Sequence, residues 1–310
     1  MQFKRGHVNA LLILALLFVM FLPVFARSVV LFSSDSSLGS VAALQRILPF
    51  GFIGYSYHSP LLGYEATRVP TWNSVLNSLL PTTIYNNWIY GIDLVVASVV
   101  LGLLFRHRVL ATAGGLLGYL AALWLGSNFT LLYAGHTGKF GVLAFTAAGL
   151  LTIELASRDG MLGWVLLAGG AVGGMFLEQQ DFALFVGLFI GAYAVFSWVR
   201  QHGWGVPGLL KYLLPMGGTA LLVAGWSLLN VYVSNVGGKE QEGGQRSTEQ
   251  QWEFVTQWSV PPDEIVDLVA PGYTGWRSGE PEGPYWGRTG QSAGWGQTHQ
   301  GFQNFRLESI

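Results

Sequence analysis

Residues 182–199 read FALFVGLFIGAYAVFSWV, with no charged side chain between Asp181 and Arg200. As an α-helix, a stretch of this length extends about 27 Å, close to the roughly 30 Å hydrocarbon core of a bilayer. Its apolar residues are continuous rather than alternating, which favours a helix over a barrel strand. We therefore expect this stretch to cross a membrane.

Similar apolar stretches recur along the chain, each bounded by charged residues or by Gly and Pro; they are 8–26, 88–105, 109–126, 139–156, 161–177 and 209–235. Only 11% of the residues are charged, against about 25% in soluble domains. The sequence therefore predicts an all-α polytopic membrane protein with about seven transmembrane helices. For the first stretch, a signal peptide cleaved near Ala26 remains an open alternative.

Charge and cysteine content exclude several kinds of partner and site. The formal net charge is -1, which gives no reason to expect nucleic acid. The chain has no cysteine, so disulfides and thiolate metal sites are excluded. Its 12 Trp and 12 Tyr suit two membrane interfaces, and membrane lipid is the expected surrounding.

Basic residues predict the orientation, because cytoplasmic loops are enriched in Lys and Arg. With a cytoplasmic N-terminus, every cytoplasmic segment is short and basic; the residues are Lys4, Arg5, Arg106, Arg108, Arg158, Arg200 and Lys211. We therefore expect a multi-pass protein of the bacterial cytoplasmic (inner) membrane, with its C-terminal tail extracytoplasmic.

This orientation leaves two long outer segments. The first, about 27–87, is expected to carry short interfacial helices at 38–50 and 72–85, where apolar residues recur on one helix face. The second, 236–310, is expected to be a linker followed by an irregular tail, separate from a transmembrane module of residues 1–235. The tail reads as truncated, so later membrane segments or a partner subunit are expected to pack on it.

One acid lies among serines just after the first apolar stretch. In FSSDSSLGS, residues 32–40, Asp35 is placed to act as a base or to bind a metal. The alternative is helix capping, in which Asp35 or Ser36 caps a helix that starts near Leu38.

A glycine-flanked histidine precedes the stretch 139–156. Gly135, His136, Gly138 and Lys139 combine backbone N–H groups, a helix N-terminus and cationic side chains, which suits a phosphate. The alternative is a Gly-rich turn with a lysine that reaches the interface.

Three more acids lie within or beside the expected spans. Glu178 and Asp181 enclose a tight outer turn, which suits a cation, a sugar or simple capping, and Asp93 lies about one turn inside a span. Glu154 is expected to reach the cytoplasmic interface instead. The glycine-rich runs around Gly115 and Gly170 predict close helix packing.

Several stretches resemble YfhO-type bacterial membrane proteins: FSSDSSLGS (32–40), YAGHTGKFGVLAF (133–145), EQQDFALFVGLFIGAYAVF (178–196), QWSVPPDEIVDLVAPGYTGW (257–276) and PYWGR (284–288). The chain departs from that family in being shorter and in having Ser34-Asp35-Ser36-Ser37 where the family has Asn-Asp-Gly-Pro. The resemblance implies a GT-C-like fold, as in glycosyltransferases that take a sugar from a polyprenyl-phosphate donor at the outer face. It implies Asp35 as catalytic acid, His136 and Lys139 as ligands of the donor phosphate, and Glu178 and Asp181 as acceptor-side or supporting residues.

Three functions compete. In a sugar transferase, Asp35 orients or deprotonates the acceptor, while Lys139, His136 and, as an open alternative, a divalent cation held by Asp35 or Asp181 neutralise the leaving phosphate. The rival is a non-catalytic membrane scaffold or a subunit that handles lipid or polymer. A transporter is disfavoured, because the polar residues gather at the outer ends of the spans. A transferase requires Asp35, His136 and Asp181 around one cavity, whereas a scaffold does not.

Overall fold

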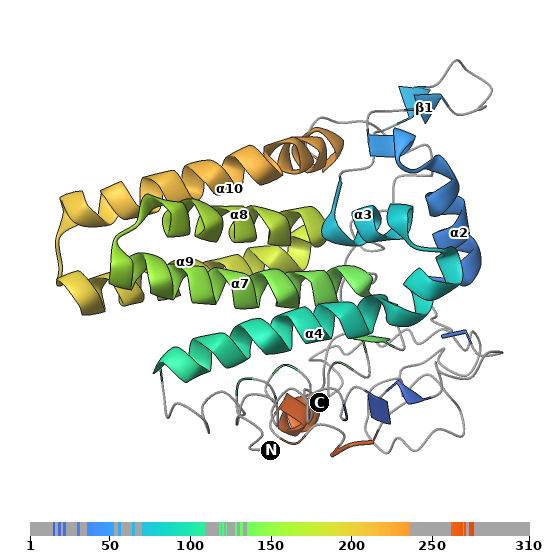
Figure 1. Cartoon of the computed structure of the whole chain (residues 1–310), viewed down its shortest axis with the longest axis horizontal. Coiled ribbons are helices and arrows are strands. Elements are labelled where there is room, and N and C mark those ends of the chain that lie inside the picture. Colours follow the sequence, from blue (N-terminus) through green and yellow to red (C-terminus); the bar gives the residue numbers. More distant parts are fainter. Residues whose placement is uncertain are drawn as a thin grey trace, which may run out of the picture. The chain divides into compact units, whose positions relative to one another are not determined.

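The computed structural model describes residues 36–52, 70–108, 135–235 and 262–268, together with single positions and short pieces within 15–31, 55–65, 118–132 and 270–275. The chain forms two compact units, residues 1–236 and 237–310, and each is described by itself. The described part of the first unit is helical apart from turns, loops and two paired two-residue strands, β1 (Tyr55–Ser56) and β2 (Tyr64–Glu65), which run antiparallel (Figure 1).

Four described helices are long and apolar enough to cross a membrane. They are α4 (Thr82–Arg108), α7 (Thr137–Asp159), α9 (Gln180–His202) and α10 (Val206–Asn235). The fold is therefore that of an α-helical membrane protein. The expected stretches 8–26 and 109–126 lie almost entirely outside the described residues.

A shorter apolar helix, α8 (Leu162–Glu178), packs against α7, α9 and α10. Its glycines allow close approach. A Cβ at Gly169 would lie 2.3 Å from the carbonyl oxygen of Met216, and a Cβ at Gly173 would lie 2.6 Å from Cβ of Val223, both on α10. The prediction that these glycines serve helix packing is confirmed for these two positions.

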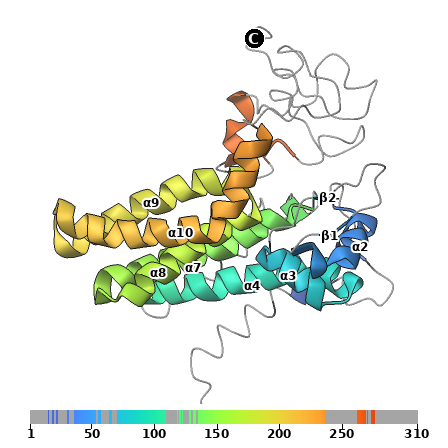
Figure 2. The ribbon, with the colours of Figure 1, turned by 90° about the horizontal axis from the view of Figure 1, so that it is seen from above.

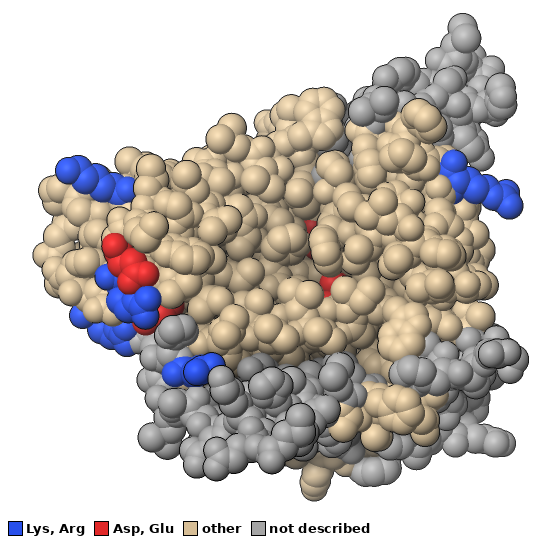
Figure 3. All heavy atoms as spheres, in the orientation of Figure 1, with Lys and Arg blue, Asp and Glu red and all other residues tan. Residues whose placement is uncertain are grey.

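The polypeptide turns from α7 to α8 at Gly160, which has φ of 65°, a left-handed conformation that favours glycine. Basic side chains lie in the last turns of α7 and α9; they are Arg158, Arg200 and His202. The positive charge of the two arginines complements the helix dipoles. Lys and Arg side chains accordingly gather at this end of the helices, over the α7–α8 and α9–α10 turns (Figure 3). We call it the basic end.

Two short helices precede α4: α2 (Leu38–Ile47) and α3 (Trp72–Leu79). Both contact α4, and α3 also contacts α7 and α8 (Figures 1 and 2). Gln45 of α2 joins them, because its Nε2 donates to the carbonyl oxygen of Asn77 at 2.7 Å and to that of Leu80. These loop helices therefore pack on the end of the bundle opposite the basic end.

Two details of this region differ from the expectation. The second loop helix ends at Leu79 rather than near residue 85, because Pro81 holds Leu80 in an extended conformation. Residues 82–87 are instead the first turns of α4. The cap of α2 is Ser37, whose Oγ accepts from the backbone N–H of Ser40 at 3.3 Å, and not Asp35 or Ser36.

The described part of the second unit is a 3-10 helix, η3 (Pro262–Leu268), and the turn after it. The carboxylate of Asp267 closes this turn, because it accepts from the backbone N–H of Thr274 at 3.1 Å and from the hydroxyl of the same residue. This segment lies within the stretch 257–276, and the two hydrogen bonds that Asp267 accepts are local.

Candidate functional site

The N-terminus of α3 lies against the ends of α7 and α8, and its first residues are in contact with two acids from other helices. Thr71 caps α3, since its Oγ1 accepts from the backbone N–H of Ser74 at 2.9 Å. The cap brings the next two residues, Trp72 and Asn73, to the carboxylates of Asp93 and Glu178. Figure 3 shows acidic atoms beside the junction of α3 and α8, enclosed by uncharged surface.

Glu178, the last residue of α8, places its carboxyl group at the N-terminus of α3. Its Oε1 accepts from the backbone N–H of Asn73 at 3.1 Å, and its Oε2 accepts from Nδ2 of the same residue at 2.7 Å. Gly141 on α7 makes room for the carboxylate, since a Cβ there would lie 2.8 Å from Cδ of Glu178. Burial raises the pKa of the Glu178 carboxyl to about 7, and the hydrogen bonds from α3 oppose that rise.

Asp93, on α4, is fully buried. Its Oδ1 accepts from the indole Nε1 of Trp72 at 3.0 Å, while its Oδ2 has no hydrogen-bond partner among the described residues. Asp93 also interacts electrostatically with Glu178. The structure thus brings together two of the three acids that we singled out within or beside the expected spans as acceptor-side or supporting residues.

Asp181, the third of these acids, is in the first turn of α9 and is exposed. Its Oδ2 accepts a long hydrogen bond, 3.5 Å, from Nε2 of Gln179. The next residue, Gln180, donates from its side chain to Ser227 on α10. The turn 178–181 therefore sends its two acids to different surroundings, a buried layer and an exposed surface.

The glycine-flanked turn before α7 differs in part from a phosphate cradle. Gly135 has φ of 87°, as a tight turn before the helix requires. The backbone N–H groups of Gly135, His136, Thr137 and Lys139 donate to carbonyl oxygens of the same chain. Most of the N–H groups that we expected to meet a phosphate are therefore already paired.

The side chains of this turn keep their candidacy. His136 is the N-cap residue of α7 and makes no side-chain capping bond, and Lys139 in the first turn is partly exposed. Gly138 lies against the C-terminal end of α8, because a Cβ at this position would lie 2.9 Å from the carbonyl oxygen of Glu178. His136, Lys139 and the acid Glu178 therefore surround the same helix end.

Asp35 lies outside the described residues, but a residue shortly before it is held in place. The backbone N–H of Leu31 donates to Oδ1 of Asn87 at 2.9 Å, and its carbonyl accepts from Nδ2 of Asn86 at 2.8 Å. Leu31 packs against a hydrophobic cluster that also contains Phe140 of α7. In the same cluster Phe140 meets Tyr90 edge-on, with ring centroids 5.1 Å apart.

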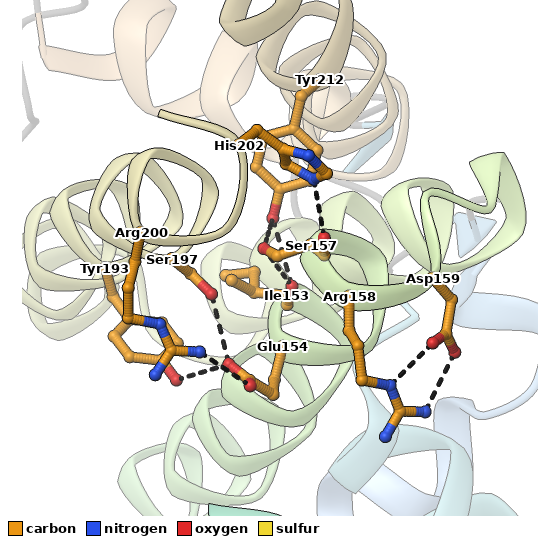
Figure 4. Close-up of polar contacts among 10 residues, drawn as sticks. All are labelled: Ile153, Glu154, Ser157, Arg158, Asp159, Tyr193, Ser197, Arg200, His202 and Tyr212. Carbon is orange, nitrogen blue, oxygen red and sulfur yellow. Dashed lines mark hydrogen bonds and ion pairs between the residues drawn. The ribbon is translucent and has the colours of Figure 1, made fainter. Parts of the chain in front are cut away.

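At the basic end, Glu154 corrects one expectation. It does not reach the interface: it is 6% exposed and its carboxylate accepts from Ser197 Oγ at 3.2 Å, Tyr193 OH at 3.4 Å and Arg200 Nη2 at 3.3 Å (Figure 4). Because its charge is paired and its oxygens are bonded, Glu154 fixes α7 to α9.

A second set of contacts ties α10 to the same end of α7. Tyr212 OH donates to the carbonyl oxygen of Ile153 at 3.3 Å and lies 3.4 Å from Oγ of Ser157 (Figure 4). His202 Nε2 lies 2.8 Å from the carbonyl oxygen of Ser157, and Trp198 stacks between His202 and Tyr212. These contacts join α9 and α10 to the C-terminal end of α7 and therefore have a structural role.

Within the residues that the structure covers, no group of three or more His, Asp or Glu side chains is arranged to hold a metal ion. In comparisons with protein-family models, with curated proteins and with solved structures, nothing matches the chain. The site is therefore interpreted from its own geometry.

Proposed function

We propose that the chain is the membrane module of a GT-C-type glycosyltransferase that resembles the YfhO-type proteins. It transfers a sugar from a polyprenyl-phosphate donor to an acceptor at the outer face of the bacterial cytoplasmic membrane. In this proposal the chain crosses the membrane about seven times from a cytoplasmic N-terminus, and the loop helices α2 and α3 lie at the outer face.

The observation that carries the proposal is a convergence at one end of the bundle. Leu31, four residues before Asp35, packs in the same hydrophobic cluster as Phe140, four residues after His136. The segment that leads to the proposed acid and the helix that bears the proposed phosphate ligands therefore meet laterally. Stretches far apart in the sequence therefore contribute to this cluster, which supports a joint site.

In this proposal, one residue acts on the acceptor and two residues act on the donor phosphate. Asp35 orients and deprotonates the acceptor hydroxyl. His136 and Lys139 supply positive charge to the phosphate that leaves when the sugar is transferred, and fixed cations act strongly near a low-dielectric boundary. Since the backbone N–H groups of this turn are mostly paired, binding of the donor depends on these two side chains.

The test is transfer in membranes that contain the full chain, with a panel of radiolabelled polyprenyl-phosphate hexoses as donors. Asp35→Asn keeps the size of the side chain and removes the base, so we expect kcat to fall at least a hundredfold with KM for the donor unchanged. Lys139→Gln should instead raise KM for the donor. Ser78→Ala, on the loop helix α3, is the control and should change neither constant.

The competing function is a membrane scaffold, which predicts no donor consumption above that of membranes without the chain. Full transfer by Asp35→Asn would also contradict the mechanism. Orientation is tested separately in this cysteine-free chain: a cysteine at Ser247 should react with an impermeant maleimide added to intact cells. Reaction only after the membrane is permeabilised would reverse the proposed topology.

A further inference from the structure

Beneath α3, buried oxygen atoms outnumber the donors available to them. Four buried side-chain atoms there lack a hydrogen-bond partner among the described residues: Oδ1 of Asn73, Oδ1 and Nδ2 of Asn77, and Oδ2 of Asp93. These three residues are at most 5% exposed. Buried polar atoms without partners are rare in folded proteins, and each one requires an explanation.

The partners of Asn73 determine which of its side-chain atoms remains unpaired. Its amide nitrogen donates to Oε2 of Glu178 at 2.7 Å and to the carbonyl oxygen of Thr137 at 3.2 Å. Both of these partners are acceptors, so the nitrogen must face them and the atom left over is the oxygen. Asn77 follows four residues later on the same face of α3. The unpaired atoms of α3 are therefore two amide oxygens and one amide nitrogen.

The charge around these atoms is also unbalanced. Asp93 and Glu178 interact electrostatically, and both are bound by N–H groups of α3 rather than by a cationic side chain. The ion pairs of the described residues join Arg158 to Asp159 and Arg200 to Glu154, both at the basic end. Two carboxylates in a poorly solvated layer are costly unless a nearby positive charge or a bound proton neutralises them.

We infer that a small oxygen-coordinated metal cation binds beneath α3, held by Oδ2 of Asp93 and the amide oxygens of Asn73 and Asn77. Carboxylate and amide oxygens are the ligands that Ca²⁺ and Na⁺ prefer, whereas a Zn²⁺-type centre would need His or further acids. Glu178 supplies a second negative charge nearby. Ordered water alone would satisfy the orphan atoms without neutralising the carboxylates, and protonation alone would neutralise the carboxylates without giving the amide oxygens a partner; a cation does both.

Cation binding has a structural consequence. The three ligands come from α3 and α4, so the ion holds the loop helix to the bundle and also closes the layer above Glu178. This site differs from the proposed catalytic site, since it uses neither Asp35 nor His136, and it can be tested without any transfer assay.

Docking of α3 can be followed in the full chain with one cysteine, because the protein has none of its own. Ser74→Cys places a thiol at a buried position of α3 (8% exposed), so its reaction with a maleimide reports undocking. The measurement compares 10 mM CaCl2, MgCl2 and NaCl with choline chloride at equal ionic strength, in detergent. We expect CaCl2 or NaCl to slow labelling at least tenfold.

Two variants locate the effect and one serves as a control. Asp93→Asn and Asn77→Leu should each abolish the slowing, while Asp159→Asn, which removes a carboxylate at the basic end, should retain it. Equilibrium dialysis with ⁴⁵Ca²⁺ and ²²Na⁺ gives a readout that does not depend on docking, with about one ion per chain expected and lost in Asp93→Asn. Equal labelling in all salts, or slowing that persists in Asp93→Asn, would overturn the inference.

Discussion

Asn73 is the residue whose loss should detach α3 most directly, because it binds two other helices at once. In Asn73→Ala, Glu178 loses the 2.7 Å bond to its Oε2, and the carbonyl oxygen of Thr137 loses a donor at 3.2 Å. A hydrogen bond to a charged group contributes about 1.5–3 kcal/mol, and a bond between neutral groups about 1 kcal/mol. Glu178 is only partly buried and keeps its bond to the backbone N–H of residue 73, so we expect a loss of about 2 kcal/mol.

The Ser74→Cys reporter converts this free energy into a rate. When docking is fast compared with labelling, the labelling rate is proportional to the population of the undocked state. A loss of about 2 kcal/mol raises that population about 30-fold. The assay is maleimide labelling of detergent-solubilised chain, with Ser74→Cys as the starting protein and Asn73→Ala added to it.

Ser78→Ala is the matched control, because its hydroxyl donates within α3, to the carbonyl oxygen of Val75 at 2.7 Å. It should change the labelling rate less than threefold. If Asn73→Ala labelled no faster than this control, the contacts of Asn73 would not hold α3 to the bundle. The position of α3 over Asp93 and Glu178 would then need another explanation.

Three further predictions test other parts of the bundle. Gly169→Ala should lower detergent stability by about 2 kcal/mol, since its Cβ would meet α10, whereas Gly170→Ala, with no atom within 4 Å, should be nearly neutral in the same thermal assay. Glu154→Gln should destabilise the chain, but less so when Arg200 is already Gln, and a double-mutant cycle measures the coupling. Because the pKa of Glu178 is raised from 4.5 to about 7, its contribution to stability is full below pH 4.5 and is lost as pH rises through 7; Glu178→Gln should flatten that part of the pH profile.

Sequence alone predicted the helices of the bundle because a lipid environment makes length and continuity sufficient. The stretches 139–156, 182–199 and 209–235 lie inside α7, α9 and α10, and 161–177 overlaps α8 in all but its first residue. The predicted stretch 88–105 starts six residues after the observed helix α4, which begins at Thr82, and this difference has a physical reason. Asn86 and Asn87 interrupt the apolar pattern, yet their amides are satisfied by the backbone of Leu31 and so remain within α4.

The sequence predicted only part of the cluster formed by Asp93, Glu178 and their partners on α3. Asp93 and Glu178 were picked out as acids in costly positions, but the donors of α3 were missed: Trp72 donates to Asp93, and Asn73 donates to Glu178. Asn73 and Asn77 in TWNSVLNSL are four residues apart behind a threonine cap, which is a readable polar face. What local sequence does not contain is the partner: Asn73 and Glu178 are 105 positions apart, and only the packing of α3 on α7 and α8 joins them.

Glu154 was misjudged for the same reason. An acid near the end of a span has two ways to avoid lipid, namely to reach the interface or to pair inside the bundle, and local sequence does not separate them. The deciding partner, Arg200, lies on α9 and 46 positions away. The neighbouring Ser197, one turn before it on the same helix, completes the set of donors.

The two ends of the bundle solve the same electrostatic problem differently, and the difference argues for where function lies. At the basic end, Glu154 is neutralised by a guanidinium and its oxygens are bonded, so this end has nothing to gain from a ligand. At the other end, Oδ2 of Asp93 has no partner among the described residues, and the unpaired amide oxygens belong to Asn73 and Asn77 of α3. A second acid, Glu178, interacts with Asp93 electrostatically. A leucine in place of Asp93 would fill the space without the cost of desolvating a carboxylate, so packing alone does not account for an acid here. An unbalanced acid beneath a small helix is therefore expected where a positively charged ligand enters, which makes the α3 end the part of the molecule to test first.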